Sequence, residues 1–154
     1  MLPFAAPAPL TLLAAGSAAV APDDVALSAS ASGGTVTRTI TNNTDGADLF
    51  CMVYGTIPGT SPEVDPLAFS AGLGEILTGG ALDPVTVPAG TSPLTFPGIL
   101  VGEYQVDWVC ANNLSSQPMH EEWGTPSAIS IHATVQPALV TVDATPARPP
   151  LFGP

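Results

Sequence analysis

Short segments in which apolar and polar residues alternate dominate the chain between residues 25 and 142. Alternation with a period of two places successive side chains on opposite faces of a β-strand. Clusters of glycine, proline and asparagine separate the segments, and helical periodicity is scarce. The pattern predicts strands at residues 25–31, 35–41, 49–54, 84–88, 94–96, 102–110, 128–135 and 138–142. The expected fold class is therefore all-β.

The most informative segment runs from Gly102 to Cys110. Tyr104, Val106, Trp108 and Cys110 fall on the same face of a strand with this alternation. We expect this face to be buried on one side of a sheet, with the cysteine sulfur beside two aromatic rings. The segment is thus interpreted as part of the hydrophobic core.

Three other segments add detail to the pattern. Residues 49–54 are apolar on both faces, which predicts a central or covered strand. Residues 35–41 place threonines on one face, while Arg38 interrupts the apolar face. We interpret Arg38 as an edge-strand charge with a packed alkyl stem, the alternative being a buried cation that binds a ligand. Apolar positions between residues 67 and 77 fit a loop with one or two helical turns.

The chain contains two cysteines, Cys51 and Cys110. An even number of cysteines in an exported chain favours a disulfide. The alternatives are a buried reduced pair or a metal site, and the second would need further ligands. We therefore expect a Cys51–Cys110 bridge that closes a long loop and stabilises the domain.

Residues 1–21 fit an export signal, because an apolar stretch leads to a small-residue triplet at positions 19–21. Prolines interrupt this stretch, and it is too short for a retained transmembrane anchor. The alternative is an Ala/Pro-rich leader that stays on the chain. We expect a signal peptide at 1–21, one domain at 22–142 and a flexible proline-rich tail at 143–154. The mature chain is then secreted or associated with the cell envelope, without a transmembrane segment.

The charge balance excludes some classes of partner. Thirteen acidic side chains face two arginines and no lysine, so the net charge is −11. Nucleic acids and acidic lipid surfaces bind through Lys and Arg, and both would repel this chain. Charged residues make up only 10% of the sequence, so Thr, Ser, Gly, Asn, Pro and Ala must cover much of the surface. The pattern is typical of an extracellular protein that acidic groups keep soluble.

The segment 102–110 resembles the penultimate strand of immunoglobulin-like domains, in which a turn glycine precedes a tyrosine and an alternating core strand. Residues 36–43 resemble their early strand, which runs into an asparagine-rich turn. The resemblance implies a bacterial secreted β-sandwich of about seven to eight strands. It also implies a domain that binds, spaces or braces other molecules. In antibody-type domains a tyrosine lies two positions before the second cysteine and the bridge joins facing sheets. Trp108 takes that position here, which argues against the antibody-type bridge. With Cys51 on the third predicted strand, we expect the bridge to join it to a neighbouring strand of the same sheet.

Candidate chemistry is concentrated around His120. A metal site would need another ligand, such as Asp107 or His132. His132 is expected to point outward on its strand, and nothing in the spacing brings it near; the chain also lacks a His-Glu-x-x-His motif. Carboxylates that could pair for glycoside cleavage are Glu63, Asp65, Glu121 and Glu122. No serine occurs in a Gly-x-Ser-x-Gly motif. We interpret this region as a solvated acidic loop and expect no catalytic residue, metal or cofactor. A small secreted hydrolase or metal-dependent enzyme that uses His120 and nearby carboxylates is the alternative.

The segment 111–126 is long for a hairpin connection and mixes apolar with polar residues, as recognition loops do. Met119, His120 and Trp123 are the predicted binding residues, although Trp123 also fits a buried staple. The sequence therefore predicts a non-enzymatic binding or structural module for an unknown protein or envelope component. A third possibility is self-association through the face of residues 35–41 or through an exposed strand edge.

Overall fold

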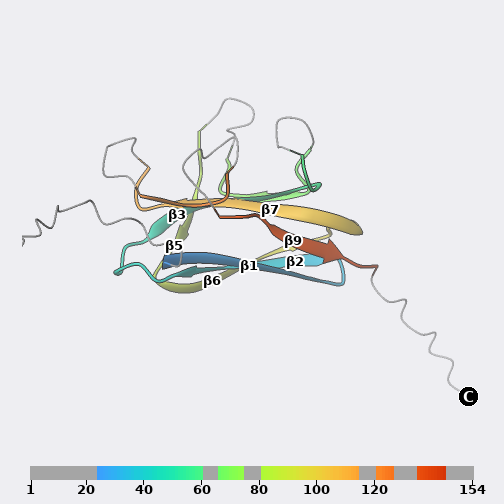
Figure 1. The fold of residues 1–154 in the computed structure, drawn as a ribbon, viewed down its shortest axis with the longest axis horizontal. Coiled ribbons are helices and arrows are strands. Elements are labelled where there is room, and N and C mark those ends of the chain that lie inside the picture. Colours follow the sequence, from blue (N-terminus) through green and yellow to red (C-terminus); the bar gives the residue numbers. More distant parts are fainter. Residues whose placement is uncertain (1–23, 61–65, 75–80, 115–120, 127–134, 145–154) are drawn as a thin grey trace, which may run out of the picture.

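The computed structural model describes residues 24–60, 66–74, 81–114, 121–126 and 135–144, which form two β-sheets packed face to face (Figure 1). Within these residues, no helix is long and apolar enough to cross a membrane. The strands of this part are β1 (Val25–Ser32), β2 (Thr35–Asn42), β3 (Leu49–Thr56), β4 (Phe69–Ala71), β5 (Val85–Val87), β6 (Gly90–Pro97), β7 (Gly102–Ala111), β8 (Glu122–Gly124) and β9 (Ala138–Val142). The predicted all-β sandwich is confirmed.

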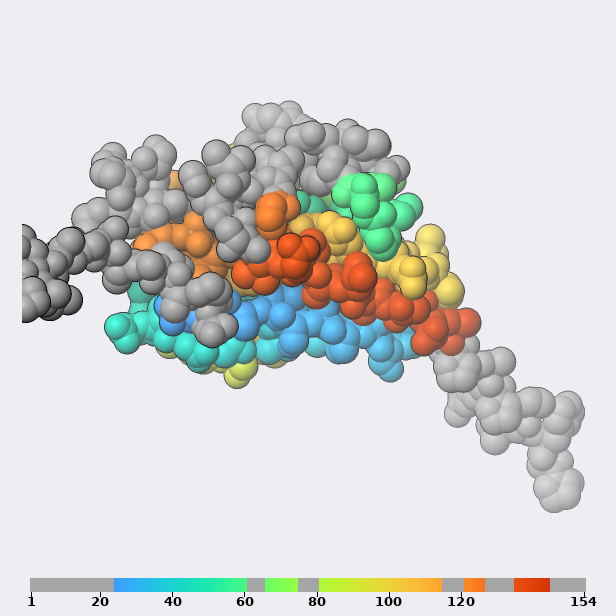
Figure 2. All heavy atoms as spheres, viewed as in Figure 1, coloured from blue at the N-terminus to red at the C-terminus, as the bar shows by residue number. Residues whose placement is uncertain are grey.

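The two layers of the sandwich are sheets of different size. The first, sheet A, has the order β1-β2-β6, and all its pairs are antiparallel. The second, sheet B, has β3 and β7 at its centre. β4 and β5 pair with β3, whereas β8 and β9 pair with β7, so each flank of sheet B consists of two short strands. β9 also lies beside β1, which closes one side of the sandwich (Figure 2).

The β1–β2 hairpin follows from its sequence pattern. Gly33 and Gly34 both have positive φ, which the tight connection between these strands requires. In β2, Val36, Arg38 and Ile40 are buried, and the threonines between them face outward. The predicted assignment of these residues to two faces is confirmed.

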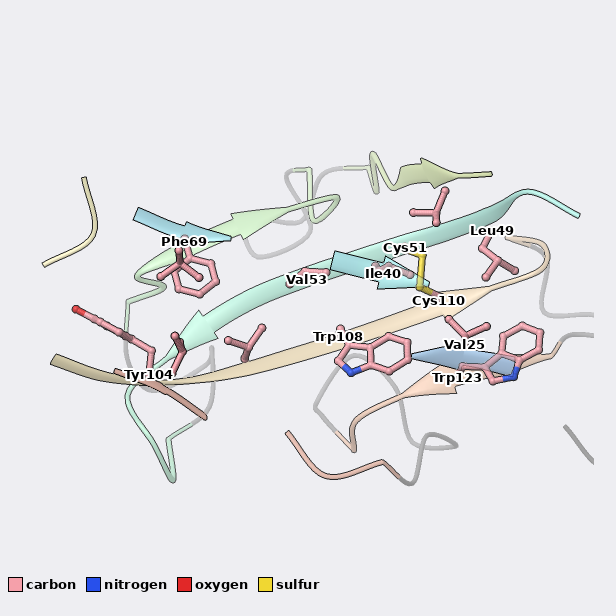
Figure 3. Packing of buried hydrophobic residues seen from close by; sticks show 14 of the residues in the cluster. Val25, Ile40, Leu49, Cys51, Val53, Phe69, Tyr104, Trp108, Cys110 and Trp123 are labelled. Atoms are coloured by element: carbon pink, nitrogen blue, oxygen red, sulfur yellow. A yellow bond between two sulfur atoms is a disulfide. The ribbon is translucent and has the colours of Figure 1, made fainter. Parts of the chain in front are cut away.

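The core fills the space between the sheets (Figure 3). Tyr104, Val106, Trp108 and Cys110 all belong to it, as their alternation along β7 predicted. Trp108 lies two residues before Cys110 at the disulfide, whereas Tyr104 lies toward the other end of the core (Figure 3). The long alternating strand therefore supplies side chains along most of the core.

The predicted disulfide is present and lies within sheet B. Cys51 of β3 is the register partner of Cys110 of β7, and their Cα atoms are 4.1 Å apart. Both residues are completely buried. The expectation that the bridge joins neighbouring strands of one sheet is confirmed.

The prediction of a helical turn around residues 67–77 is wrong for the part described. Phe69–Ala71 forms β4, while residues 75–80 lie outside the described residues. Phe69 is the register partner of Gly55, and a Cβ on Gly55 would lie 2.3 Å from the Phe69 ring. The glycine makes room for the ring, which stacks on Phe96 with centroids 4.7 Å apart. Pairing with β3 therefore overrides the weak helical pattern.

Two further expectations need correction or fall outside the description. Arg38 is not on an edge strand, because β2 pairs with β1 on one side and β6 on the other. The segment 111–126 was expected to be a loop, but it contains β8 at Glu122–Gly124. The predicted signal peptide, most of the strand predicted at 128–135 and the tail from residue 145 lie outside the described residues.

Candidate functional site

Three connections between strands meet at one end of the sandwich. β3 begins and β7 ends there, because Phe50 pairs with Ala111. The start of β6 lies at the same end, since Gly90 pairs with Asn42 at the end of β2. We call this end the loop end. Its described residues are 42–48, 87–90, 111–114 and 121–122.

The side chain of Asn42 braces the loop end. Only 1% of its surface is exposed. Its Nδ2 donates to the backbone oxygens of Ala47 at 3.0 Å and Val87 at 3.2 Å. Its Oδ1 accepts from the backbone N–H of Thr44 at 3.1 Å and from the Thr44 hydroxyl at 2.6 Å. One buried amide thus shapes the β2–β3 turn and fastens it to the end of β5.

Asn112 closes the base of the β7–β8 loop. Its backbone N–H donates to the Glu121 backbone oxygen at 3.2 Å, and its Nδ2 donates to the Glu121 carboxylate at 3.2 Å. Its Oδ1 accepts from the Glu121 backbone N–H and from Asn113 Nδ2, each at 3.1 Å. These contacts fix both ends of the loop to the sheet, an arrangement typical of loops that carry recognition.

Of the predicted binding residues, only Trp123 is described, since Met119 and His120 lie outside the described residues. Trp123 lies on β8 opposite Cys110 and is 5% exposed within the core cluster (Figure 3). Its Nε1 is buried and has no hydrogen-bond partner in the described part of the chain. Trp123 therefore anchors β8 by packing, which is the second role that the sequence allowed. A contact role for Met119 and His120 stays a prediction.

The described surface at the loop end is acidic. Asp45 and Asp48 are exposed in the β2–β3 turn, and Glu121 is half-buried beside Asn112. The sequence places neither arginine in these turns. A partner that approaches this end meets negative potential, which favours neutral or basic groups.

A buried carboxylate lies on the outer face of β7. Asp107 is 3% exposed, and its Oδ1 accepts from the Thr125 hydroxyl at 2.7 Å. Its Oδ2 accepts from Gln105 Nε2 at 2.7 Å. The Thr125 hydroxyl also accepts the backbone N–H of Trp108 at 3.1 Å. This network ties β7 to the segment that follows β8, a role that the sequence alone did not reveal.

The enzymatic alternative depends mostly on residues outside the description. His120, His132, Glu63 and Asp65 lie outside the described residues. Among those described, no three His, Cys, Asp or Glu side chains gather closely enough to hold a metal ion. The Glu121 carboxylate accepts a hydrogen bond from Asn112, and that of Asp107 is buried in its own network.

Arg38 is a buried cation in the middle of sheet A. It is 1% exposed, and its strand neighbours are Ala29 and Leu94. Its Nε and Nη1 are buried without a hydrogen-bond partner in the part of the chain that the structure describes. Desolvation by burial lowers the pKa of Arg38 to about 10. The guanidinium therefore costs folding free energy at neutral pH.

Replacing Arg38 by methionine is expected to raise the free energy of unfolding by about 1–3 kcal/mol at pH 7, because an apolar side chain removes the buried charge. The lowered pKa means that the unfolded chain binds more protons above pH 10, so wild-type stability rises with pH there. Urea unfolding of both proteins between pH 8 and 11 measures the difference between their free energies of unfolding. This difference should become smaller at pH 11. Arg38→Lys retains a cation and should not match the methionine variant. A methionine variant less stable than wild type would show that the guanidinium has a partner.

The outer face of sheet A carries hydroxyl groups and no charge. Its residues are Ala26, Ser28, Ser30 and Ser32 of β1, Thr35, Thr37, Thr39 and Thr41 of β2, and Thr91, Pro93, Thr95 and Pro97 of β6. The two prolines lack the N–H that an added strand would need, so they protect the outer edge of β6 against pairing. Self-association through the threonine face itself stays a prediction.

No family model, curated protein or solved structure matches the chain. The fold alone therefore defines its class, an all-β sandwich with a disulfide inside one sheet. An asparagine-rich turn after residue 41 was expected from the sequence, but the contact of Asn42 with Val87 of β5 was not. The bracing role of Asn112 was not predicted either, and its only signal was its position just after the end of a long strand.

Proposed function

We propose that this chain is an exported immunoglobulin-like domain that acts as a non-enzymatic binding module, with the loop end as its recognition surface. The order of the strands supports this fold family. The chain crosses from sheet A to sheet B after β2, returns at β6 and crosses again to β7. Such crossings between two antiparallel sheets are the Greek-key connections of immunoglobulin-like sandwiches.

A second observation supports the same family. Tyr104 lies near the start of β7, and its hydroxyl donates to the backbone oxygen of Leu100 at 2.9 Å. A tyrosine at this corner that bonds to the backbone a few residues upstream is a hallmark of immunoglobulin-like sandwiches. The corner fixes the β6–β7 connection at the end opposite the loop end.

The observation that carries the binding function is the hydrogen-bonded base of the β7–β8 loop. Asn112 holds Glu121 through backbone and side-chain contacts, and Asn42 braces the neighbouring turn. Connections held on a rigid sandwich lose little entropy when a partner binds. The acidic side chains at the loop end, Asp45, Asp48 and Glu121, favour a protein or envelope component that presents neutral or basic groups.

Export is part of the proposal. The Cys51–Cys110 bridge suits an oxidising compartment, and the apolar leader at residues 1–21 fits an export signal. These two features together support the proposal of a secreted or envelope-associated location. No specific observation favours the hydrolase alternative.

A photoreactive residue at Leu114 tests the recognition surface. Leu114 belongs to the β7–β8 loop and is 58% exposed, so the replacement leaves the core intact. Cells that export the protein should yield a discrete covalent adduct with another molecule after irradiation. The matched control is a photoreactive residue at Thr95, which is exposed on the outer face of sheet A. It should trap no such partner.

A further variant connects the adduct to the loop base. Asn112→Ala removes the side-chain clamp and should lower the adduct yield at Leu114 while the circular dichroism spectrum is retained. Equal adducts at both positions, or none at Leu114 from abundant exported protein, would overturn the proposed recognition surface. A covalent dimer from Thr95 would instead support self-association through the threonine face.

A further inference from the structure

The outer face of sheet B carries a small hollow near the start of β7. It has a volume of about 120 Å³, with room for one side chain. Glu103 of β7 and Thr141 of β9 are register partners, and both point away from the core, because their neighbours Tyr104 and Val140 belong to it. The residues that line the hollow are Pro58, Glu103, Leu139, Val140 and Thr141.

The turn that carries Pro58 is held in place by hydrogen bonds. The backbone N–H and the hydroxyl of Thr60 both donate to the Ile57 backbone oxygen, at 3.1 Å and 2.8 Å. The backbone N–H of Gly59 donates to Gln105 Oε1 at 3.3 Å, which fastens the turn to β7. One wall of the hollow is thus fixed by the fold, and a preformed wall loses little entropy when a ligand binds.

The lining of the hollow combines one carboxylate with apolar groups. Glu103 is exposed, and the hydroxyl of Thr141 on the paired strand is a further hydrogen-bond acceptor. Leu139 is 72% exposed, and Pro58 adds a second apolar group to the lining. A lysine side chain matches this set, because its ammonium group pairs with oxygen atoms while its aliphatic stem packs on apolar groups.

We propose that this hollow binds a lysine side chain of a partner protein, with the ammonium group at Glu103 and the stem against Leu139 and Pro58. The chain contains no lysine, so neither its own residues nor a second copy can supply this group. Arg38, the one arginine that the structure describes, is buried in the core and does not compete for Glu103. The net charge of −11 attracts a basic partner.

The polar groups of the hollow favour lysine over arginine. A guanidinium carries five N–H donors in a planar fork, whereas an ammonium group carries three on a compact centre. The lining offers the carboxylate of Glu103 and the hydroxyl of Thr141 beside apolar groups. Some guanidinium donors would therefore face apolar surface without a hydrogen-bond partner, which costs binding free energy.

An NMR titration of the full chain with the capped peptide Gly-Lys-Gly tests the proposal. Binding should shift the amide signals of Glu103, Leu139 and Thr141 in a saturable way. Norleucine in place of lysine keeps an aliphatic stem and removes the charge, so it should weaken the affinity about two- to fivefold, the effect of an exposed ion pair. The peptide with arginine in place of lysine should also bind more weakly than the lysine peptide.

Variants of the chain separate the two parts of the contact. Glu103→Gln should remove the preference for lysine over norleucine. The matched control Asp48→Asn removes an exposed carboxylate at the loop end and should retain the preference. Leu139→Ser should weaken the binding of both peptides about two- to fivefold through lost apolar contact and leave the ratio of their affinities unchanged.

Equal affinities for the lysine and norleucine peptides, or a preference that survives Glu103→Gln, would overturn the proposed ammonium site. Tighter binding of the arginine peptide would overturn the assignment to lysine. Signal shifts confined to the loop end would show that the hollow is not the site. The hollow shares no residue with the loop end, so this proposal and the proposed recognition surface can fail separately.

Discussion

Replacing Gly124 by alanine is expected to lower the free energy of unfolding by about 4 kcal/mol. Gly124 has a φ of 142°, and a Cβ there would lie 2.1 Å from the backbone oxygen of Trp108. Backbone strain and overpacking each cost about 1–3 kcal/mol at such a position. The clash pushes β8 away from β7, so Trp123 loses its place in the core. Urea unfolding followed by tryptophan fluorescence measures the loss.

Gly102→Ala is the matched control for this prediction. Gly102 also lies in a strand of sheet B, but its φ is not in the left-handed region and its added Cβ would meet Tyr104 at an ordinary 3.5 Å. Gly102→Ala should change the free energy of unfolding by no more than about 1 kcal/mol. If Gly124→Ala destabilised the protein as little as Gly102→Ala does, the close contact of β8 with β7 at Gly124 would be contradicted. Glu121, which Asn112 holds at the base of the β7–β8 loop, directly precedes β8. Gly124→Ala should therefore also lower the yield of the Leu114 adduct.

Prediction from the sequence succeeded for features that depend on the residues of a single strand. In β7, alternation alone identified the buried face, because a strand with one core face must repeat with a period of two. This information lies in the residues of β7 themselves. The expectation of a bridge within one sheet, which is also confirmed, needed the assignment of Cys51 to the third predicted strand in addition to the position of Trp108 before Cys110.

Prediction failed where a distant strand decides the outcome. Arg38 looked like an edge charge, but β6, which lies far along the chain, pairs Leu94 with Arg38 and makes β2 central. Phe69 belongs to a strand because Gly55 lies opposite it and leaves room for its ring. Neither fact is written in the residues beside Arg38 or Phe69. Such contacts become visible only once register is known.

For the candidate site, too, local features were predictable from the sequence and contacts between strands were not. The segment 111–126 was recognised from its length and composition, whereas its base at Asn112 depends on the register of β7 with β8. Trp123 had two possible roles, and pairing of β8 with Cys110 turned its side chain into the core. What the sequence can indicate is the loop. The geometry then determines which of its residues brace it.

Replacing both Cys51 and Cys110 by alanine is expected to lower the free energy of unfolding by up to about 4 kcal/mol. The bridge closes a loop with a sequence separation of 59, and its removal raises the entropy of the unfolded chain. Urea unfolding of the two proteins under non-reducing conditions measures the difference. The variant Cys51→Ala with Cys110→Val refills part of the space, so it should recover only the packing share of the loss. A double-alanine variant within about 1 kcal/mol of wild type would contradict the entropic role.

The place of the bridge also predicts where the weakened domain opens first. Cys51 and Cys110 lie one register pair inside the end of the β3–β7 ladder, next to Phe50 and Ala111. Asn112 and the base of the β7–β8 loop follow directly. Without the bridge, hydrogen exchange should accelerate at this end more than at the opposite end around Gln105, where β9 and the Tyr104 corner remain. Uniform acceleration along β7 would mean that the bridge stabilises the fold as a whole and does not selectively brace the loop end.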